Sequence, residues 1–261
     1  MIRTILGFLA LFSYLIISKQ LKPWIQVIKT HFWTLLCLGV ISYAVSYLLQ
    51  YLGLSFTTAT RQAIMSNTQT FWVVMINLII FKRKPKPLFI LGAVLAFFGV
   101  FLVVYDNSSA GSNGYLIGDI ISLISFISWG AYTAFSKHIS TQEPPLFVTT
   151  SIILFATIFL TPLSFGLGAY QELIQLTGIQ WLIMIYMGCI CVGITFLLWA
   201  NALADKEIPS ENIAIITMLN PIVGIMFAAI ILGELISLQE FIGLCIVLFS
   251  VIIAEQSKKI K

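Results

Sequence analysis

Long uninterrupted apolar stretches dominate this sequence of 261 residues. A helix needs about 20 apolar residues to cross a bilayer core that is about 30 Å thick. The stretches do not alternate with a period of two, so they predict membrane-spanning helices rather than barrel strands. Nine segments qualify: 2–18, 33–54, 56–81, 87–105, 115–136, 145–168, 178–203, 208–232 and 236–254. We therefore expect an all-α integral membrane protein with about nine transmembrane helices and short connections.

The composition excludes several other classes of protein. Only 9% of the residues are charged and 59% are hydrophobic, with a mean hydropathy of +1.02. Soluble chains carry roughly 25% charged residues, and so few charges could not cover a soluble surface. A disordered chain, a disulfide-rich secreted domain and a nucleic-acid-binding protein are excluded on the same grounds.

The basic residues predict the orientation in the membrane. Cytoplasmic segments carry an excess of Lys and Arg. If the C-terminus is cytoplasmic, the only basic residues left on the outer side are Arg3 and Arg61. All the others then fall in cytoplasmic loops or the tail: Lys19, Lys22, Lys29, Lys82, Arg83, Lys84, Lys86, Lys137, Lys206, Lys258, Lys259 and Lys261. The net charge of +4 thus reflects topology and not a nucleic-acid partner.

An internal repeat relates the two halves of the chain. A shift of 151 residues lays 52–103 onto 203–254 without gaps, and it pairs Gln69 with Asn220. The segment 115–136 has no counterpart, so the chain reads as four spans followed by five. Because the paired loops fall on opposite membrane faces, we expect two inverted repeats, an arrangement common among secondary transporters. The predicted parts are a first repeat at 1–105, an outer linker at 106–114, a second repeat at 115–254 and a basic tail at 255–261.

Three segments of the second half carry a family resemblance. They are GDIISLISFISWGAYTAFSK at 118–137, GCICVGITFLLWANAL at 188–203 and LNPIVGIMFAAIILGELISLQEFIG at 219–243. With these segments the chain resembles the EamA-type transporters of the drug/metabolite transporter superfamily. The resemblance implies ten helices in two inverted halves of five.

The chain departs from this family pattern in two ways. It begins at what corresponds to the second helix, which we interpret as a truncated or mis-started reading frame. In the first half, Thr70 stands where the second half has Pro221. Proline removes a backbone donor and bends a helix, so we expect the first half to bend less near the midplane.

Polar and aromatic residues within the spans are the candidates for a solute site. Amides inside a membrane are costly unless they are satisfied, so Gln69 and Asn220 serve either a solute or helix–helix packing. Tyr47 and Gln50 share a helix face with Tyr51, which could instead belong to an interfacial aromatic belt. Aromatic side chains suit amphipathic or cationic organic solutes, although packing alone also explains them. The candidate substrate-binding residues are Tyr47, Gln50, Gln69, Trp129, Tyr132, Trp199 and Asn220.

Charged residues give little further indication of chemistry. Arg61, at the outer end of its span, is interpreted as reaching lipid headgroups, with an anionic substrate as the alternative. Asp119 is interpreted as stabilised by the dipole at the start of its helix, with a proton or cation site as the alternative. Glu234 is interpreted as a residue that caps or orients the last span. No Asp, Glu, Lys or Arg falls at mid-depth of the predicted spans.

The predicted function is therefore secondary transport of small organic solutes by alternating access. The resemblance favours export of metabolites, amino acids or drugs across the plasma membrane. We expect no cofactor and no metal, because the histidines and cysteines form no ligand motif. The partners are a small-molecule substrate and the lipid bilayer, and the sequence leaves open a homodimer. The alternative function is a membrane-embedded enzyme or a sensor without transport, although no catalytic dyad is visible at depth.

Overall fold

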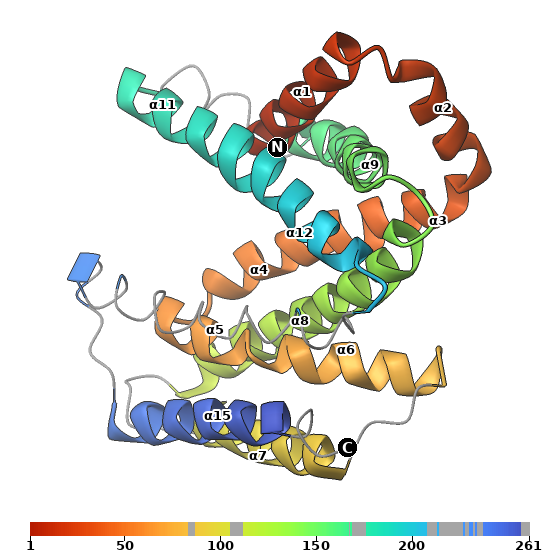
Figure 1. Ribbon diagram of the computed structural model, residues 1–261. Coiled ribbons are helices and arrows are strands. Elements are labelled where there is room, and N and C mark those ends of the chain that lie inside the picture. Colours follow the sequence, from red (N-terminus) through yellow and green to blue (C-terminus); the bar gives the residue numbers. More distant parts are fainter. Residues whose placement is uncertain are drawn as a thin grey trace. The chain divides into compact units, whose positions relative to one another are not determined.

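The structure is a computed structural model that describes residues 1–82, 87–104, 112–166, 176–207 and 237–256, with a few single positions between these ranges. These residues are mostly helical, and none of them forms a strand. The elements in chain order (Figure 1) are α1 Ile2–Ile17, α2 Leu21–Thr30, α3 Phe32–Cys37, η1 Leu38–Val45, α4 Ser46–Leu54, α5 Ala59–Met65, α6 Thr68–Ile79, α7 Pro87–Val104, α8 Ser112–Ser140, α9 Pro145–Gly166, α11 Gly178–Tyr186, η2 Met187–Ile194, α12 Thr195–Ala204 and α15 Leu238–Gln256.

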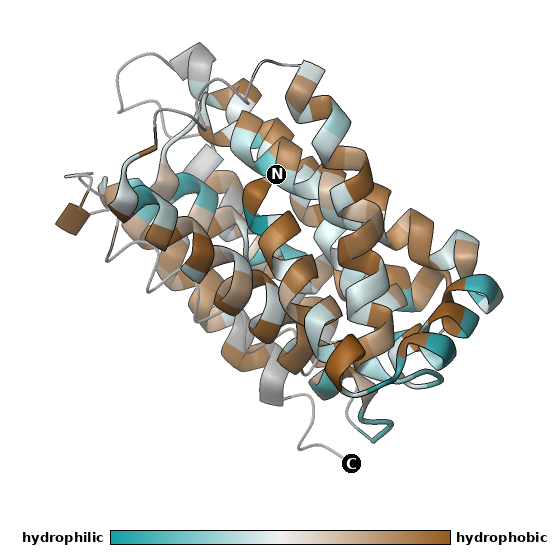
Figure 2. Ribbon diagram, turned by 90° about the horizontal axis from the view of Figure 1, so that it is seen from above, coloured by the Kyte–Doolittle hydropathy of each residue, from teal (hydrophilic) through white to brown (hydrophobic). Residues whose placement is uncertain are grey.

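The helices confirm the all-α membrane class. Four of them are long and apolar enough to cross a bilayer: Phe32–Leu54, Tyr115–Ser140, Pro145–Gly166 and Gly178–Ala204. Shorter apolar helices cover Ile2–Ile17, Ile90–Gly99 and Leu238–Ser250. Hydrophobic residues colour much of the helical ribbon brown in Figure 2. The predicted span 208–232 lies almost entirely outside the described residues.

The chain forms two compact units, each built from segments of both halves of the sequence. Unit 1 contains 1–45 and 135–208, and unit 2 contains 46–134 and 209–261. Two of the three boundaries fall inside continuous helices, Phe32–Leu54 and Tyr115–Ser140. The units therefore do not coincide with the repeats predicted from the sequence, which stay a prediction.

Close helix contacts in unit 1 depend on glycine. A Cβ on Gly39 would lie 2.6 Å from the carbonyl oxygen of Ile152, and a Cβ on Gly7 would lie 2.5 Å from a methyl carbon of Val192. Small residues of this kind let helix backbones approach closely, which is a main source of packing energy in membranes. In unit 2 the pair Gly99 and Gly243 does the same between α7 and α15.

Two membrane-length helices contain a π-helical stretch. These stretches are η1, Leu38–Val45, and η2, Met187–Ile194. When the sequence is aligned with itself at a shift of 151 residues, η1 at 38–45 corresponds to 189–196. Most of η2 lies within this corresponding segment. A π-helix widens the turn and weakens the regular hydrogen-bond ladder, and it is common at functional positions of helices.

Two elements differ from the prediction. The segment after the first span, expected as a loop, forms α2, which buries Trp24 and Val27 and exposes Lys22 and Lys29. This is the pattern of a helix lying at a membrane interface. The span 56–81 is not one helix either, because it is interrupted between Met65 and Thr68.

The interruption arises without a proline. Three consecutive side chains donate back to backbone carbonyls three residues earlier: Ser66 Oγ to Ala63, Asn67 Nδ2 to Ile64 and Thr68 Oγ1 to Met65, at 2.7, 3.1 and 2.8 Å. Such side chains compete with the helical ladder and bend or break it. The first half is thus interrupted near Thr70 although it has no proline there. Pro221 of the second half lies outside the described residues, so the prediction that the first half bends less stays a prediction.

Candidate functional site

One face of α8 within unit 2 is polar and buried. Its members recur every three or four residues, as one helix face requires. They are Asp119, Ser122, Ser125, Trp129, Tyr132 and Thr133. The opposite face exposes Ile120, Ile124 and Ile127, which are 49%, 47% and 37% exposed. In a membrane this distribution turns the isoleucines to lipid and keeps the polar groups among other helices.

A buried ion pair occupies one end of this face. Arg61 on α5 donates from Nη2 to Asp119 Oδ2 at 2.6 Å and from Nε to the same oxygen at 3.2 Å. Thr57 Oγ1 donates to the other carboxylate oxygen, Oδ1, at 2.6 Å. Arg61 is 1% exposed and Asp119 is fully buried. The prediction that Arg61 reaches lipid headgroups is therefore wrong, because the guanidinium is held inside unit 2.

The position of Asp119 also differs from the prediction. Helix α8 begins at Ser112, so Asp119 lies about two turns inside it and not in the first turn. A helix dipole acts mainly within the first and last turns. Asp119 is therefore stabilised by Arg61 and Thr57 and not by the end of its own helix.

A third charged group joins this end, and sequence analysis missed it. Glu240 Oε1 lies 4.0 Å from Arg61 Nη1, and Glu240 is 5% exposed. Its other oxygen, Oε2, accepts from the backbone nitrogen of Ser237 at 3.0 Å, while the Ser237 hydroxyl accepts from the Glu240 backbone nitrogen. The sequence signal was the Ser-x-x-Glu pattern at 237–240, which is typical of a capped helix start. Arg61, Asp119 and Glu240 are far from one another in the sequence, and the fold brings them together.

Gln62 bridges three segments next to the ion pair. Its amide nitrogen donates to the backbone carbonyl of Gln50 at 2.9 Å and to Ser122 Oγ at 3.0 Å. Gly53 makes this approach feasible, because a Cβ there would lie 2.3 Å from Ser122 Oγ. The backbone of Gln50, on α4, therefore lies next to the polar face of α8. The predicted role of the Gln50 side chain in substrate binding stays a prediction.

Three predicted aromatic residues lie together further along α8. The rings of Tyr47 and Trp129 are 5.2 Å apart at 85°, and those of Trp129 and Tyr132 are 5.1 Å apart at 86°. Edge-to-face pairs of this geometry are favourable and rigid. Tyr51, by contrast, is 55% exposed, in agreement with a place in an interfacial belt. Tyr47, Trp129 and Tyr132 thus form one aromatic group, which we call the aromatic trio.

The other predicted residues are placed separately. Gln69 Nε2 lies 3.4 Å from Thr133 Oγ1, on the same face of α8 as the aromatic trio. Trp199 is half-buried and belongs to unit 1. Asn220 lies outside the described residues, as does Glu234. The structure therefore gathers Tyr47, Gln50, Gln69, Trp129 and Tyr132 in unit 2, and their binding of a solute stays a prediction.

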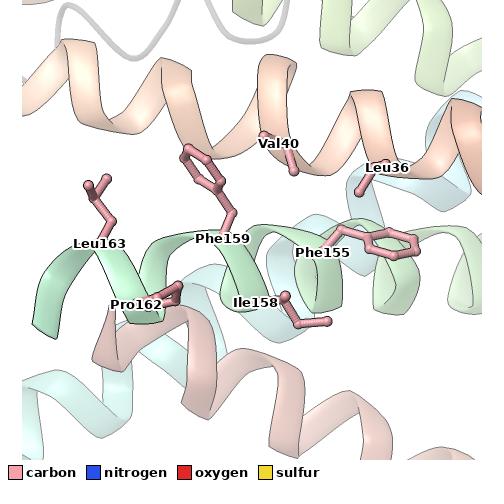
Figure 3. Close-up of a pocket in the computed structure, with 7 residues that line it drawn as sticks. All are labelled: Leu36, Val40, Phe155, Ile158, Phe159, Pro162 and Leu163. Carbon is pink, nitrogen blue, oxygen red and sulfur yellow. The ribbon is translucent and has the colours of Figure 1, made fainter. Parts of the chain in front are cut away.

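An open apolar groove in unit 1 offers no comparable chemistry. It has a volume of about 410 Å³ and is lined by Leu36, Val40, Phe155, Ile158, Phe159, Pro162 and Leu163. Figure 3 shows these side chains on two neighbouring helices. A site that orients a polar solute needs a few well-placed polar groups, and this lining supplies none. The polar face of α8 is therefore the better candidate for a functional site.

Comparison with known proteins gives the family. The model of the EamA-like transporter family matches residues 1–105 and 116–255, so the chain belongs to this family. It is thus a multi-pass membrane protein of a transporter family, as the sequence resemblance implied.

Curated relatives agree with the family match. The chain is 24% identical over 234 residues to an uncharacterized transporter of Archaeoglobus fulgidus, covering 87% of this chain and 79% of the relative. It is 22% identical to the uncharacterized transporter YetK of Bacillus subtilis, covering 79% of this chain and 63% of the relative. It is 24% identical to a probable amino-acid metabolite efflux pump of Escherichia coli, covering 69% of this chain and 62% of the relative. For the last two, the chain spans less than two thirds of the relative's length.

A solved structure supports the fold. This crystal structure of a protein matches with a TM-score of 0.66 at 15% sequence identity, covering all of this chain and 88% of that one.

Proposed function

We propose that this protein is a secondary transporter that carries small organic solutes across the plasma membrane. In this proposal the two repeats, 1–105 and 115–254, open the solute site to each side of the membrane in turn, and the C-terminus is cytoplasmic. The observation that carries the proposal is the buried polar face of α8. Membrane helices bury such groups at a cost, so they are usually kept for function.

The chemistry of this face supports organic solutes that have both apolar and polar parts. The aromatic trio presents ring edges and faces, while Gln62, Ser122 and Gln69 present amide and hydroxyl groups. Aromatic walls with a few polar groups are the usual lining of small-molecule sites. Export of amino-acid metabolites is the direction and substrate class that we propose, supported by the name of the Escherichia coli relative.

Transport assays in proteoliposomes test this proposal. The purified protein is expected to carry at least one radiolabelled solute from a panel of amino acids, amines and carboxylates. Gln69→Ala and Asn220→Ala are expected to insert normally and to lose most of this transport. Tyr51→Ala is the matched control, because Tyr51 is exposed on the same helix as Tyr47 and is expected to leave transport unchanged.

The outcome also separates the alternatives. A membrane-embedded enzyme or a sensor would move none of the solutes. If both amide variants transport at the wild-type rate, the proposed site is wrong even if the protein is a transporter.

A further inference from the structure

Helix α2 is held on unit 1 through its buried face and its C-terminal end. Trp24 Nε1 donates to Ser151 Oγ on α9 at 2.9 Å, and the Trp24 ring meets Phe12 of α1 edge-on, with centroids 5.7 Å apart. Directly after α2, His31 Nε2 lies 3.2 Å from Glu143 Oε1, just before α9. In Figure 1, α2 is a separate short helix that turns away from both α1 and α3. Its buried face is therefore docked on the protein, and its other face is exposed.

The exposed face of α2 is basic. Lys22 and Lys29 are seven residues apart, which puts them on one side of the helix, about 10 Å from each other along its axis. Ile25 and Gln26 lie between them, and all four residues are exposed. We call these four residues the basic face. The sequence contains no Asp or Glu in residues 1–105, so no carboxylate of α1, α2 or α3 neutralises the two lysines.

A third lysine precedes α2 at a backbone position that favours glycine. Helix α1 ends with the Gln20 nitrogen donating to the Leu15 carbonyl and the Lys19 nitrogen to the Ile16 carbonyl, both at 3.0 Å. In this Schellman motif Lys19 has a φ of +56°, where glycine is the usual residue. Lysine costs backbone energy here, and its side chain is exposed. What Lys19 adds over glycine is a positive charge next to the basic face.

Exposed aromatic residues indicate the depth of α2 in the membrane. Tyr14, in the last turn of α1, is 57% exposed, and Trp33, in the first turn of α3, is 74% exposed. Tyr and Trp gather at the headgroup level of bilayers. Between these two residues the chain passes from the apolar helix Ile2–Ile17 to the span Phe32–Leu54. Helix α2 therefore lies where the chain turns at one surface of the bilayer, at the level of the headgroups.

We propose that α2 binds the headgroups of anionic phospholipids, with their phosphate groups on Lys19, Lys22 and Lys29. An ammonium group is a compact charge with three donors, which suits a phosphate on a mobile lipid. Each lysine close to an anionic membrane surface strengthens binding about fivefold. A ligand that binds only the folded protein stabilises it, and the contacts of Trp24 and His31 pass this stabilisation from α2 to the rest of unit 1. The inference is independent of which solute the protein transports.

Lipid titration of the purified full-length protein in mild detergent tests this site. Native mass spectrometry gives the dissociation constant, and thermal unfolding gives the stabilisation. Phosphatidylglycerol is expected to bind at least tenfold more tightly than phosphatidylcholine with the same acyl chains, to raise the unfolding temperature, and to lose both effects as salt is added. Glycerol 3-phosphate, which has the phosphate but no acyl chains, is expected to have no effect. Equal binding of the two lipids, or an equal response to glycerol 3-phosphate, overturns the proposal.

Removing charge from the basic face is the decisive variant. The double substitution Lys22→Gln with Lys29→Gln is expected to weaken phosphatidylglycerol binding about 25-fold, whereas arginine at both positions is expected to retain it. Lys206→Gln is the matched control. Lys206 is also an exposed lysine of unit 1, but Asp205 and Glu207 flank it, so its removal is expected to leave the affinity unchanged.

Two further variants separate a lost site from a damaged fold. Lys19→Gly removes a charge where the backbone favours glycine, so it is expected to weaken phosphatidylglycerol binding about fivefold without lowering the unfolding temperature in phosphatidylcholine. Gln26→Lys adds a charge to the basic face and is expected to tighten binding about fivefold. If the affinity for phosphatidylglycerol is the same in the wild type, the double glutamine variant and Gln26→Lys, α2 is not a lipid site and the proposal is wrong.

Discussion

The two units bury polar side chains in different ways. In unit 1, Thr150 and Ser151 on α9 donate to carbonyls of their own helix at 2.7 Å, and Ser151 also accepts from the indole nitrogen of Trp24 on α2 at 2.9 Å. The core of Leu11, Ile153 and Val192 is apolar. In unit 2, the polar side chains of α8 bond to other helices, through Asp119 to Arg61 and through Ser122 to Gln62.

This difference indicates which buried polar side chains only satisfy their own helix and which connect two helices. A hydroxyl that bonds its own helix is satisfied wherever the helix goes, so it places few demands on its neighbours. A side chain that bonds another helix fixes the two helices relative to each other, and it becomes available to a ligand when they move. Unit 2 therefore contains the buried charged and amide groups that could exchange protein partners for solute, whereas the buried Trp24–Ser151 bond of unit 1 joins two neutral side chains.

The largest loss of unfolding free energy is expected from breaking the buried ion pair of unit 2. Asp119→Ala removes the carboxylate that holds Arg61, and losing one partner of a buried pair costs about 3–5 kcal/mol. Glu143→Ala in unit 1 is the control, because its pair with His31 is 24–25% exposed and such pairs contribute about 0–1 kcal/mol. The free energy of unfolding in mild detergent measures both. Equal losses in the two variants would contradict the contrast between the units.

A smaller effect is expected from alanine at the closely packed glycines, with a different outcome in each unit. Gly39→Ala in unit 1 meets the rigid carbonyl of Ile152 at 2.6 Å, so we expect a stability loss of about 1–3 kcal/mol. Gly53→Ala in unit 2 first meets the Ser122 side chain, which can rotate away and release Gln62. This variant is expected to lose less stability and more transport than Gly39→Ala. Thermal unfolding and proteoliposome flux on the same preparations check the order, and the reverse order would refute it.

A loss of stability no larger than that of Gly39→Ala is expected when a single hydrogen-bonding side chain is removed. Gln62→Leu leaves the Gln50 carbonyl and the Ser122 hydroxyl without this donor, which costs about 1–3 kcal/mol. Thr150→Val removes only a bond to the same helix and is expected to stay within about 0.5 kcal/mol of the wild type. Chemical unfolding of both variants is the measurement. A larger loss in Thr150→Val would mean that unit 1 also depends on its polar side chains.

Much of the fold follows from the sequence, because lipid imposes a simple rule on segment length. Apolar stretches such as 33–54 and 178–203 match helices Phe32–Leu54 and Gly178–Ala204 closely. Helix α2 was missed because ten residues containing two lysines and a proline are too short and too polar for that rule. The break before Thr68 was missed because the expected signal was proline and not a run of short polar side chains.

The candidate site was predicted in its aromatic part and missed in its ionic part. Tyr47, Trp129 and Tyr132 were identifiable because aromatic residues spaced on a helix face can be read from the sequence alone. Arg61 was misjudged because the sequence does not show what lies opposite it after folding, and 58 residues separate it from Asp119.

The most direct test of the central claim is the reactivity of a cysteine at Ser125 in sealed, oriented vesicles. The native thiols are first replaced by serine or alanine in a variant that still transports, and Ser125→Cys is then treated with a water-soluble thiol reagent from each side. We predict modification from both sides in the absence of solute and slower modification when a transported solute is present. A cysteine at Ser151 in unit 1 should stay unreactive under the same conditions. If the cysteine at Ser125 stays unreactive from both sides of vesicles that are transporting solute, the polar face of α8 does not line the route, and the account is wrong.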